Sequence, residues 1–260
     1  MKLRISKDAR PQARTLLFAA LLSIALWFIP FAEILTYPFR IFVTFIHEGG
    51  HALAALLTGN SVASLSVAMN ASGETYTTNG GLLSQVFVSS AGYLGATIYG
   101  ALLLVLIRRA VAARIVLAGT AVLILALTGV YGFLVPLAHG MISPFTVLAG
   151  ILIPLGLLAV SRYASPRAAT FFVSFLAVQC VLNAVFDLKT VFFLSSPLQS
   201  AGVATDAQNM ANATGIPAIL WAAVWIGISF LILSIAMRAY SISRSRHASQ
   251  QDLPFEDAAI

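Results

Sequence analysis

His47, Glu48 and His51 form an H-E-x-x-H motif within a strongly apolar segment. On a helix, positions i and i+4 share a face, so both imidazoles can be directed at one metal ion. Glu48 directly follows His47 and is close enough to act as a general base on a water held by that ion. The spacing therefore predicts a zinc-dependent hydrolase centre with His47 and His51 as ligands and Glu48 as the catalytic residue.

The motif supplies most of the polarity of the segment from Ile34 to Leu57. Besides Arg40, the side chains of this segment that are charged or titrate near neutral pH are those of the motif itself. Placing such groups in a bilayer costs free energy and usually marks a functional site. A polar patch that only joins helices by hydrogen bonds is the alternative. Three such groups at metal-site spacing favour metal binding.

Two histidines leave a catalytic zinc site incomplete, because such sites take three protein ligands and keep one position for water. Asp187 is the leading candidate for the third ligand, since its carboxylate has strongly apolar neighbours and needs a partner. Pairing with Lys189 or Arg40 is the alternative for this carboxylate. We expect one zinc ion per chain, held by His47, His51 and Asp187.

Other polar residues compete for a role at this centre. Asn183 lies one helical turn before Asp187, and Cys180 lies two turns before it, on the same face. Asn183 is predicted to bind substrate or orient Asp187, with helix packing as the alternative. Cys180 and His139 are weaker ligand candidates, because a buried free cysteine usually serves packing and a histidine in an interfacial loop is more often solvated or anchors the loop. Asp206 is expected in a solvated polar loop, where a gate or substrate contact is the functional alternative.

The composition is that of a membrane protein. Hydrophobic residues make up 59% of the 260-residue chain and charged residues only 9%, and the mean hydropathy is +0.92. These values exclude an ordinary soluble domain and predict a multi-pass protein in a lipid bilayer. The net charge of +6 comes from Arg and Lys clusters at the ends of the hydrophobic segments. This position indicates that the clusters set the orientation of the protein in the membrane, so we expect no nucleic-acid partner. The single cysteine excludes an intrachain disulfide.

The elements that must position the motif follow from the hydrophobic pattern. We expect an all-α protein with about six or seven transmembrane helices. The stretch Thr58–Gly80 is rich in Gly, Ser and Thr and predicts a β-hairpin, with its turn near Asn70–Gly73. Residues 1–240 are expected to form one domain, residues 195–215 a polar loop, and residues 241–260 a disordered tail. The predicted helical segments are Thr15–Phe31, Ile34–Leu57 with a possible start at Pro38, Leu82–Ile107, Ile115–Pro136, Phe145–Val160, Ala168–Leu194 and Pro217–Tyr240.

These features together resemble the site-2 protease family of intramembrane zinc metallopeptidases, in its compact bacterial branch. The resemblance rests on the His47–His51 motif, the β-like stretch, the small-residue segment Ala91–Gly95, and Asp187. It implies zinc binding by His47, His51 and Asp187, with Glu48 as the base. It also implies a transmembrane protein as substrate and a location in the bacterial inner membrane.

The expected reaction is peptide-bond hydrolysis within the membrane by a zinc-activated water. A helical substrate must first unwind, since its peptide bonds are shielded by internal hydrogen bonds. The edge of the predicted hairpin could pair with the unwound chain as an added strand. An inactive scaffold or regulator of the same fold is one alternative, because Leu188 stands where the family has glycine after the aspartate. A transporter that uses the polar residues as a translocation site is the other.

Overall fold

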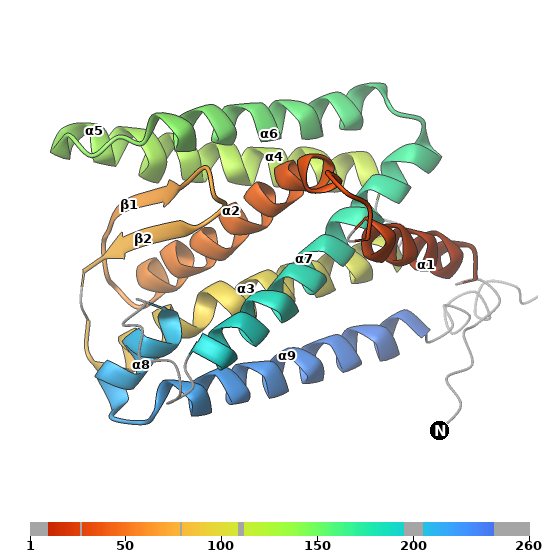
Figure 1. The fold of residues 1–260 in the computed structure, drawn as a ribbon. Coiled ribbons are helices and arrows are strands. Elements are labelled where there is room, and N and C mark those ends of the chain that lie inside the picture. Colours follow the sequence, from red (N-terminus) through yellow and green to blue (C-terminus); the bar gives the residue numbers. More distant parts are fainter. Residues whose placement is uncertain (1–9, 27, 79, 109–111, 195–204, 242–260) are drawn as a thin grey trace, which may run out of the picture.

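The computed structural model of the protein describes residues 10–26, 28–78, 80–108, 112–194 and 205–241 (Figure 1). The predicted disordered tail, apart from Ser241, lies outside these residues, as does the first half of the predicted polar loop. The described helices are α1 (Arg10–Ala25), α2 (Glu33–Leu57), α3 (Leu82–Arg108), α4 (Ala113–Leu127), the π-helix η2 (Thr128–Leu134), α5 (Val135–His139), α6 (Pro144–Tyr163), α7 (Pro166–Leu194), α8 (Asp206–Thr214) and α9 (Ala218–Ser241). The strands are β1 (Val62–Val67) and β2 (Gly73–Thr77).

The predicted fold class is confirmed: the described chain is mostly helical, with a two-stranded hairpin between α2 and α3. Each of the seven predicted hydrophobic segments contains a helix, but in the first, which was expected to extend to Phe31, helix α1 ends at Ala25. Within the described residues, five helical segments are long and apolar enough to cross a membrane: α3, the continuous run from α4 through η2 to α5, α6, α7 and α9. The apolar part of α1 is shorter, at Ala13–Ala25. The protein is therefore a multi-pass membrane protein.

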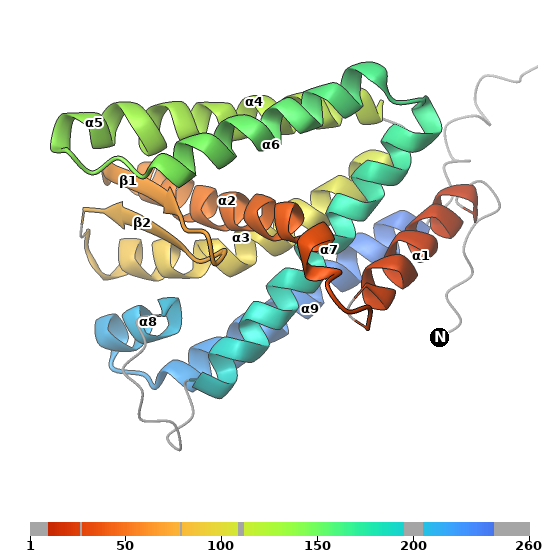
Figure 2. The ribbon, with the colours of Figure 1, turned by 45° about the horizontal axis from the view of Figure 1, so that its top comes forward.

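Helix α2 lies at the centre of the helices and carries the motif in its second half (Figure 2). It begins at Glu33, so Pro38 lies inside the helix and does not mark its start. Pro38 is the sixth residue of α2, beyond the first turn, and its missing N–H removes one helical hydrogen bond, that to the Ile34 carbonyl. Phe42 and Phe45 are buried in the main core. The same packing that buries these aromatic rings also holds the motif in place.

The hairpin lies beside α2 and pairs antiparallel, with Leu65 opposite Thr75 and Val67 opposite Gly73. Its turn runs from Ala68 to Ser72, with the Ser72 N–H donating to the Asn70 side chain at 3.0 Å. Strand β1 is the buried strand and is fixed to α6. The Thr146 hydroxyl there accepts from the Val67 N–H at 2.9 Å and donates to the Val67 carbonyl at 3.1 Å. Strand β2 thus faces away from α6.

The prediction of a polar loop is wrong for its second half, which forms the short helix α8. The Thr205 side chain caps the N-terminus by accepting from the Gln208 N–H at 3.2 Å. Gly215 ends the helix in the left-handed conformation, with φ of 73°. Met210 is fully buried in a cluster with Trp225 of α9. This packing against α9 and α3 brings α8 close to the hairpin and to α2 (Figures 1 and 2).

Candidate metal centre

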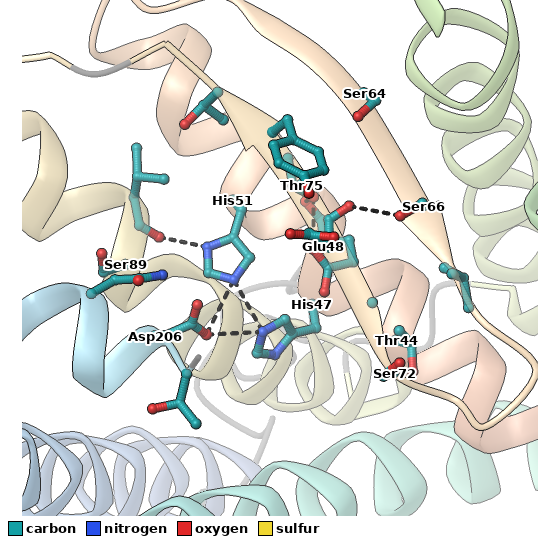
Figure 3. Close-up of a pocket in the computed structure, with 18 of the residues that line it drawn as sticks. Thr44, His47, Glu48, His51, Ser64, Ser66, Ser72, Thr75, Ser89 and Asp206 are labelled. Carbon is teal, nitrogen blue, oxygen red and sulfur yellow. Dashed lines mark hydrogen bonds and ion pairs between the residues drawn. The ribbon is translucent and has the colours of Figure 1, made fainter. Parts of the chain in front are cut away.

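Three side chains from two distant elements meet at one point between α2 and α8 (Figure 3). The Nε2 atoms of His47 and His51 lie 3.0 Å apart. The Asp206 Oδ2 atom lies 3.2 Å from Nε2 of His47 and 3.3 Å from Nε2 of His51. The two imidazoles are thus on one helix face, as predicted, and a carboxylate closes a triangle of donor atoms.

The donor triangle fits a zinc ion. Zinc binds His nitrogen and carboxylate oxygen at about 2.0–2.2 Å in tetrahedral sites, which places neighbouring donor atoms roughly 3.3 Å apart. The observed separations of 3.0–3.3 Å match one face of such a tetrahedron. A centre with three protein donors leaves the fourth position open, which is the arrangement of catalytic zinc sites.

Neighbouring groups orient both imidazoles. The His51 Nδ1 atom lies 2.6 Å from the carbonyl oxygen of Val88, and a carbonyl can only accept. Nδ1 of His51 therefore carries a proton, and in the neutral form of this side chain the Nε2 lone pair points toward the donor triangle. The His47 ring lies edge-on to Tyr93, with ring centroids 4.6 Å apart. Both contacts come from α3, which covers the centre on one side.

Gly92 makes the space in which an ion would sit. A Cβ atom at Gly92 would lie 2.5 Å from Nε2 of His51 and would also overlap Nε2 of His47. A Cβ atom at Gly50 would overlap the backbone carbonyl of Ala91. The two glycines therefore allow α2 and α3 to approach closely at the centre, and any other residue at position 92 would occupy the metal-facing side of both imidazoles.

Asp206 is suited to hold a cation. Its side chain is 18% exposed. Burial alone would raise the pKa of Asp206, but the charge of His51 and the hydrogen bonds with both imidazoles outweigh it and hold that pKa well below its usual range. The carboxylate is therefore ionised at neutral pH and contributes a full negative charge to the centre.

Glu48 lies beside the donor triangle without being part of it (Figure 3). Its side chain is buried, and the Thr75 hydroxyl of β2 donates to its Oε2 atom at 2.7 Å. The two histidines of the motif thus belong to the donor triangle and Glu48 does not, which is compatible with the predicted roles of two ligands and one separate carboxylate.

The centre opens into a cavity of about 1190 Å³ bordered by α2, the hairpin, α3, α7 and α8. Hydroxyl and amide side chains supply much of its wall, and the charged residues among them are all acidic: Glu48, Glu74, Asp187 and Asp206. Such a wall can hold water, which a hydrolytic reaction requires. The volume exceeds the range of about 300–1,000 Å³ typical of small-molecule pockets, so it can accommodate several residues of a peptide.

The other candidate residues from the sequence lie in different surroundings. Asp187 lines the same cavity, but Asp206 is the carboxylate that joins the donor triangle. The Asn183 amide donates to the Gln179 carbonyl on its own helix at 2.8 Å, and Asn183 is not among the cavity-lining residues. Cys180 is buried in the core, and His139 is exposed at the end of α5. The roles expected of Asp187 and Asn183 remain predictions.

Sequence reasoning passed over Asp206 because its surroundings are polar. A local signal was nevertheless present: Thr205 and Gln208 are spaced as an N-terminal capping pair, and Gly215 marks a C-terminus. These signals predict a helix that places Asp206 in its first turn. They do not predict where that helix packs.

The fold and the centre define a class, that of multi-pass membrane proteins with a His-His-Asp donor set beside a buried glutamate. Residues 16–236 match the family model of the Peptidase M50B-like proteins, and the chain belongs to this family. This result confirms the predicted resemblance to site-2 proteases. No curated protein and no solved structure matches the chain.

Proposed function

We propose that this protein is an intramembrane zinc metalloprotease that hydrolyses peptide bonds of transmembrane proteins. The observation that carries the proposal is the donor triangle of His47, His51 and Asp206 with the buried Glu48 beside it. Membership of a peptidase family supports peptide bonds as the substrate. We assign Asp206 as the third ligand, and Asp187 is the competing candidate in the same cavity.

The residues of the chain divide the chemistry between them. Bound zinc would supply a Lewis acid that activates water and polarises the scissile carbonyl. Glu48 accepts a proton from the attacking water and later delivers it to the leaving amine. The Thr75 hydroxyl donates to Oε2 of Glu48 and so holds this carboxylate in place for the proton transfer. The Val88 carbonyl and the Tyr93 ring keep the imidazoles in place during this exchange.

The cavity suits an extended peptide. A peptide bond inside a helix is shielded by its own hydrogen bonds, so the substrate must be unwound before it is cleaved. Strand β2 borders the cavity, and its free edge offers backbone groups to an added strand. Polar walls would hydrate the unwound segment. The membrane-length helices support a location in a membrane, and we propose a bacterial inner membrane from the resemblance to the compact bacterial branch of the site-2 proteases.

Purification in detergent followed by zinc analysis and cleavage of model transmembrane substrates tests this function. The parent protein should contain one zinc ion per chain and cleave. Glu48→Gln should retain zinc and lose at least about 100-fold in cleavage rate, because general-base catalysis contributes about that much. Glu33→Gln, the same change at the start of the same helix, should behave like the parent.

A parent protein without zinc would contradict the proposal, as would a Glu48→Gln variant that cleaves as fast as the parent. Zinc binding without cleavage of any substrate would instead favour the inactive scaffold. Zinc that crosses the membrane in vesicles containing the protein, without cleavage, would favour the transporter.

A further inference from the structure

Strand β2 contacts both oxygen atoms of the Glu48 carboxylate. The Thr75 hydroxyl donates to Oε2 at 2.7 Å and lies 3.2 Å from the Glu48 backbone carbonyl. On the other side, the Cα of Gly73 faces Oε1. A Cβ atom at Gly73 would overlap Oε1 and would lie 2.6 Å from Cγ of Glu48. Among the described residues, the hydroxyl of Thr75 is the side-chain hydrogen-bond partner of this carboxylate.

The strand that carries Thr75 is fixed independently of Glu48. Thr75 pairs with Leu65, which is fully buried in the core. The turn before β2 is attached to α2 at two points: the Tyr37 hydroxyl donates to the Met69 carbonyl at 2.6 Å, and the Thr44 hydroxyl donates to the Ala71 carbonyl at 2.9 Å. Thr75 is therefore held by its strand and can impose a position on the glutamate.

We propose that Thr75 is a positioning residue for Glu48, and that β2 sets the direction in which the base faces its proton. This inference rests on the proposed function. A glutamate side chain has several rotatable bonds, and a base must lie within hydrogen-bond reach of the proton that it takes. The Thr75 hydroxyl holds one oxygen of Glu48 and thereby fixes the orientation of the whole carboxylate. Absence of a side chain at Gly73 gives the carboxylate its room.

The arrangement also links the base to the substrate. If an unwound substrate pairs with the free edge of β2, the same strand aligns both reactants. Loss of the Thr75 hydroxyl should then reduce the rate of the chemical step and leave substrate affinity nearly unchanged, because backbone pairing along the strand does not need that hydroxyl.

Two substitutions distinguish the effect of the Thr75 hydroxyl from the effect of the side chain's shape. Thr75→Val keeps the shape and removes the donor, whereas Thr75→Ser keeps the donor and removes a methyl group. Thr170→Val is the matched control, since Thr170 is partly exposed on α7 and donates to the Pro166 carbonyl of its own helix. Zinc content, kcat and KM are measured for each variant on one transmembrane substrate.

Thr75→Val should lower kcat on the order of 10- to 100-fold, with KM changed less than about threefold, since one hydrogen bond to a charged group is lost. Zinc content should equal that of the parent. Thr75→Ser should recover to within about threefold of the parent kcat. Gly73→Ala keeps the hydroxyl and should also lower kcat, because its methyl group displaces the carboxylate.

An unchanged kcat in Thr75→Val or in Gly73→Ala would overturn the inference. So would a loss of zinc in Thr75→Val, or a Thr75→Ser variant as impaired as Thr75→Val, because both results indicate a structural role. These results leave the protease function intact as long as the parent cleaves and Glu48→Gln does not. If the parent fails to cleave, the proposed function falls first, and the positioning role falls with it.

Discussion

The Oδ2 atom of Asp206 lies 3.2 Å from Nε2 of His47, although 159 residues separate the two in the chain. Helix α8 makes this contact possible by packing on α3 and α9. The Trp221 side chain of α9 donates to the Thr214 hydroxyl at 3.0 Å, which fixes the far end of α8. The donor set thus depends on the packing of a short helix that is distant from the motif in the sequence but adjacent to it in the fold.

The assignment of the third ligand leads to the first prediction. Asp206→Ala removes one corner of the donor triangle and should weaken zinc binding by more than about 100-fold, which exceeds the usual cost of losing an outer-shell partner. Asp187→Ala removes a cavity-lining carboxylate and should retain zinc. Titration with a competing chelator measures both affinities.

The reverse pattern, with zinc lost in Asp187→Ala and retained in Asp206→Ala, would establish Asp187 as the ligand. Loss of zinc in both variants would indicate that each carboxylate reaches the ion.

Gly92 gives a second prediction. Gly92→Ala places a methyl group against Nε2 of both imidazoles and should abolish zinc binding while the protein stays folded. Gly95→Ala is the control on the same helix, because its Cβ would lie 3.5 Å from the Cα of Gly50, an ordinary contact. Zinc content and thermal unfolding in detergent distinguish the two. A Gly92→Ala protein with full zinc would mean that the ion does not lie between these imidazoles.

Acidification should release the metal through the histidines. Zinc binds neutral imidazoles, so protons compete with it for the ring nitrogens of His47 and His51. The pKa of Asp206 is held well below its usual range, so this carboxylate stays ionised in mild acid. The zinc dissociation constant should therefore rise as the pH falls, by up to about 100-fold per pH unit where both imidazoles take up a proton. Zinc retained after dialysis at stepwise lower pH measures the effect, and a dissociation constant that does not change with pH would contradict it.

The buried hydroxyl of Thr146 supports a prediction about stability. It is the side chain that joins β1 to α6 through both backbone groups of Val67. Thr146→Val should lower the free energy of unfolding by about 1–3 kcal/mol, because a buried N–H and a buried carbonyl each lose a partner. Thr170→Val, at a partly exposed position, should have little effect. Thermal unfolding in detergent compares the two, and equal stability would show that Val67 finds other partners.

Local patterns explain which features the sequence could predict. The spacing of His47 and His51 fixes a shared helix face, since that depends only on helical periodicity. The hairpin also follows from local composition, and its turn lies where Asn70 predicts it. The third carboxylate could not be predicted in the same way, because the distance from Asp206 to the motif depends on tertiary packing. Asp187 was favoured for its apolar neighbours, which report depth in the membrane and not proximity to His47.

The long separation of the ligands has a consequence for biosynthesis. A ribosome adds about 5–20 residues per second, so Asp206 is made roughly 8 to 30 s after His47, given the 159 residues between them. Until α8 has emerged and packed, the nascent chain offers the motif without its third ligand. If the proposed function holds, hydrolytic activity should therefore appear only after most of the protein has been inserted, so that an incomplete chain does not cleave neighbouring nascent membrane proteins.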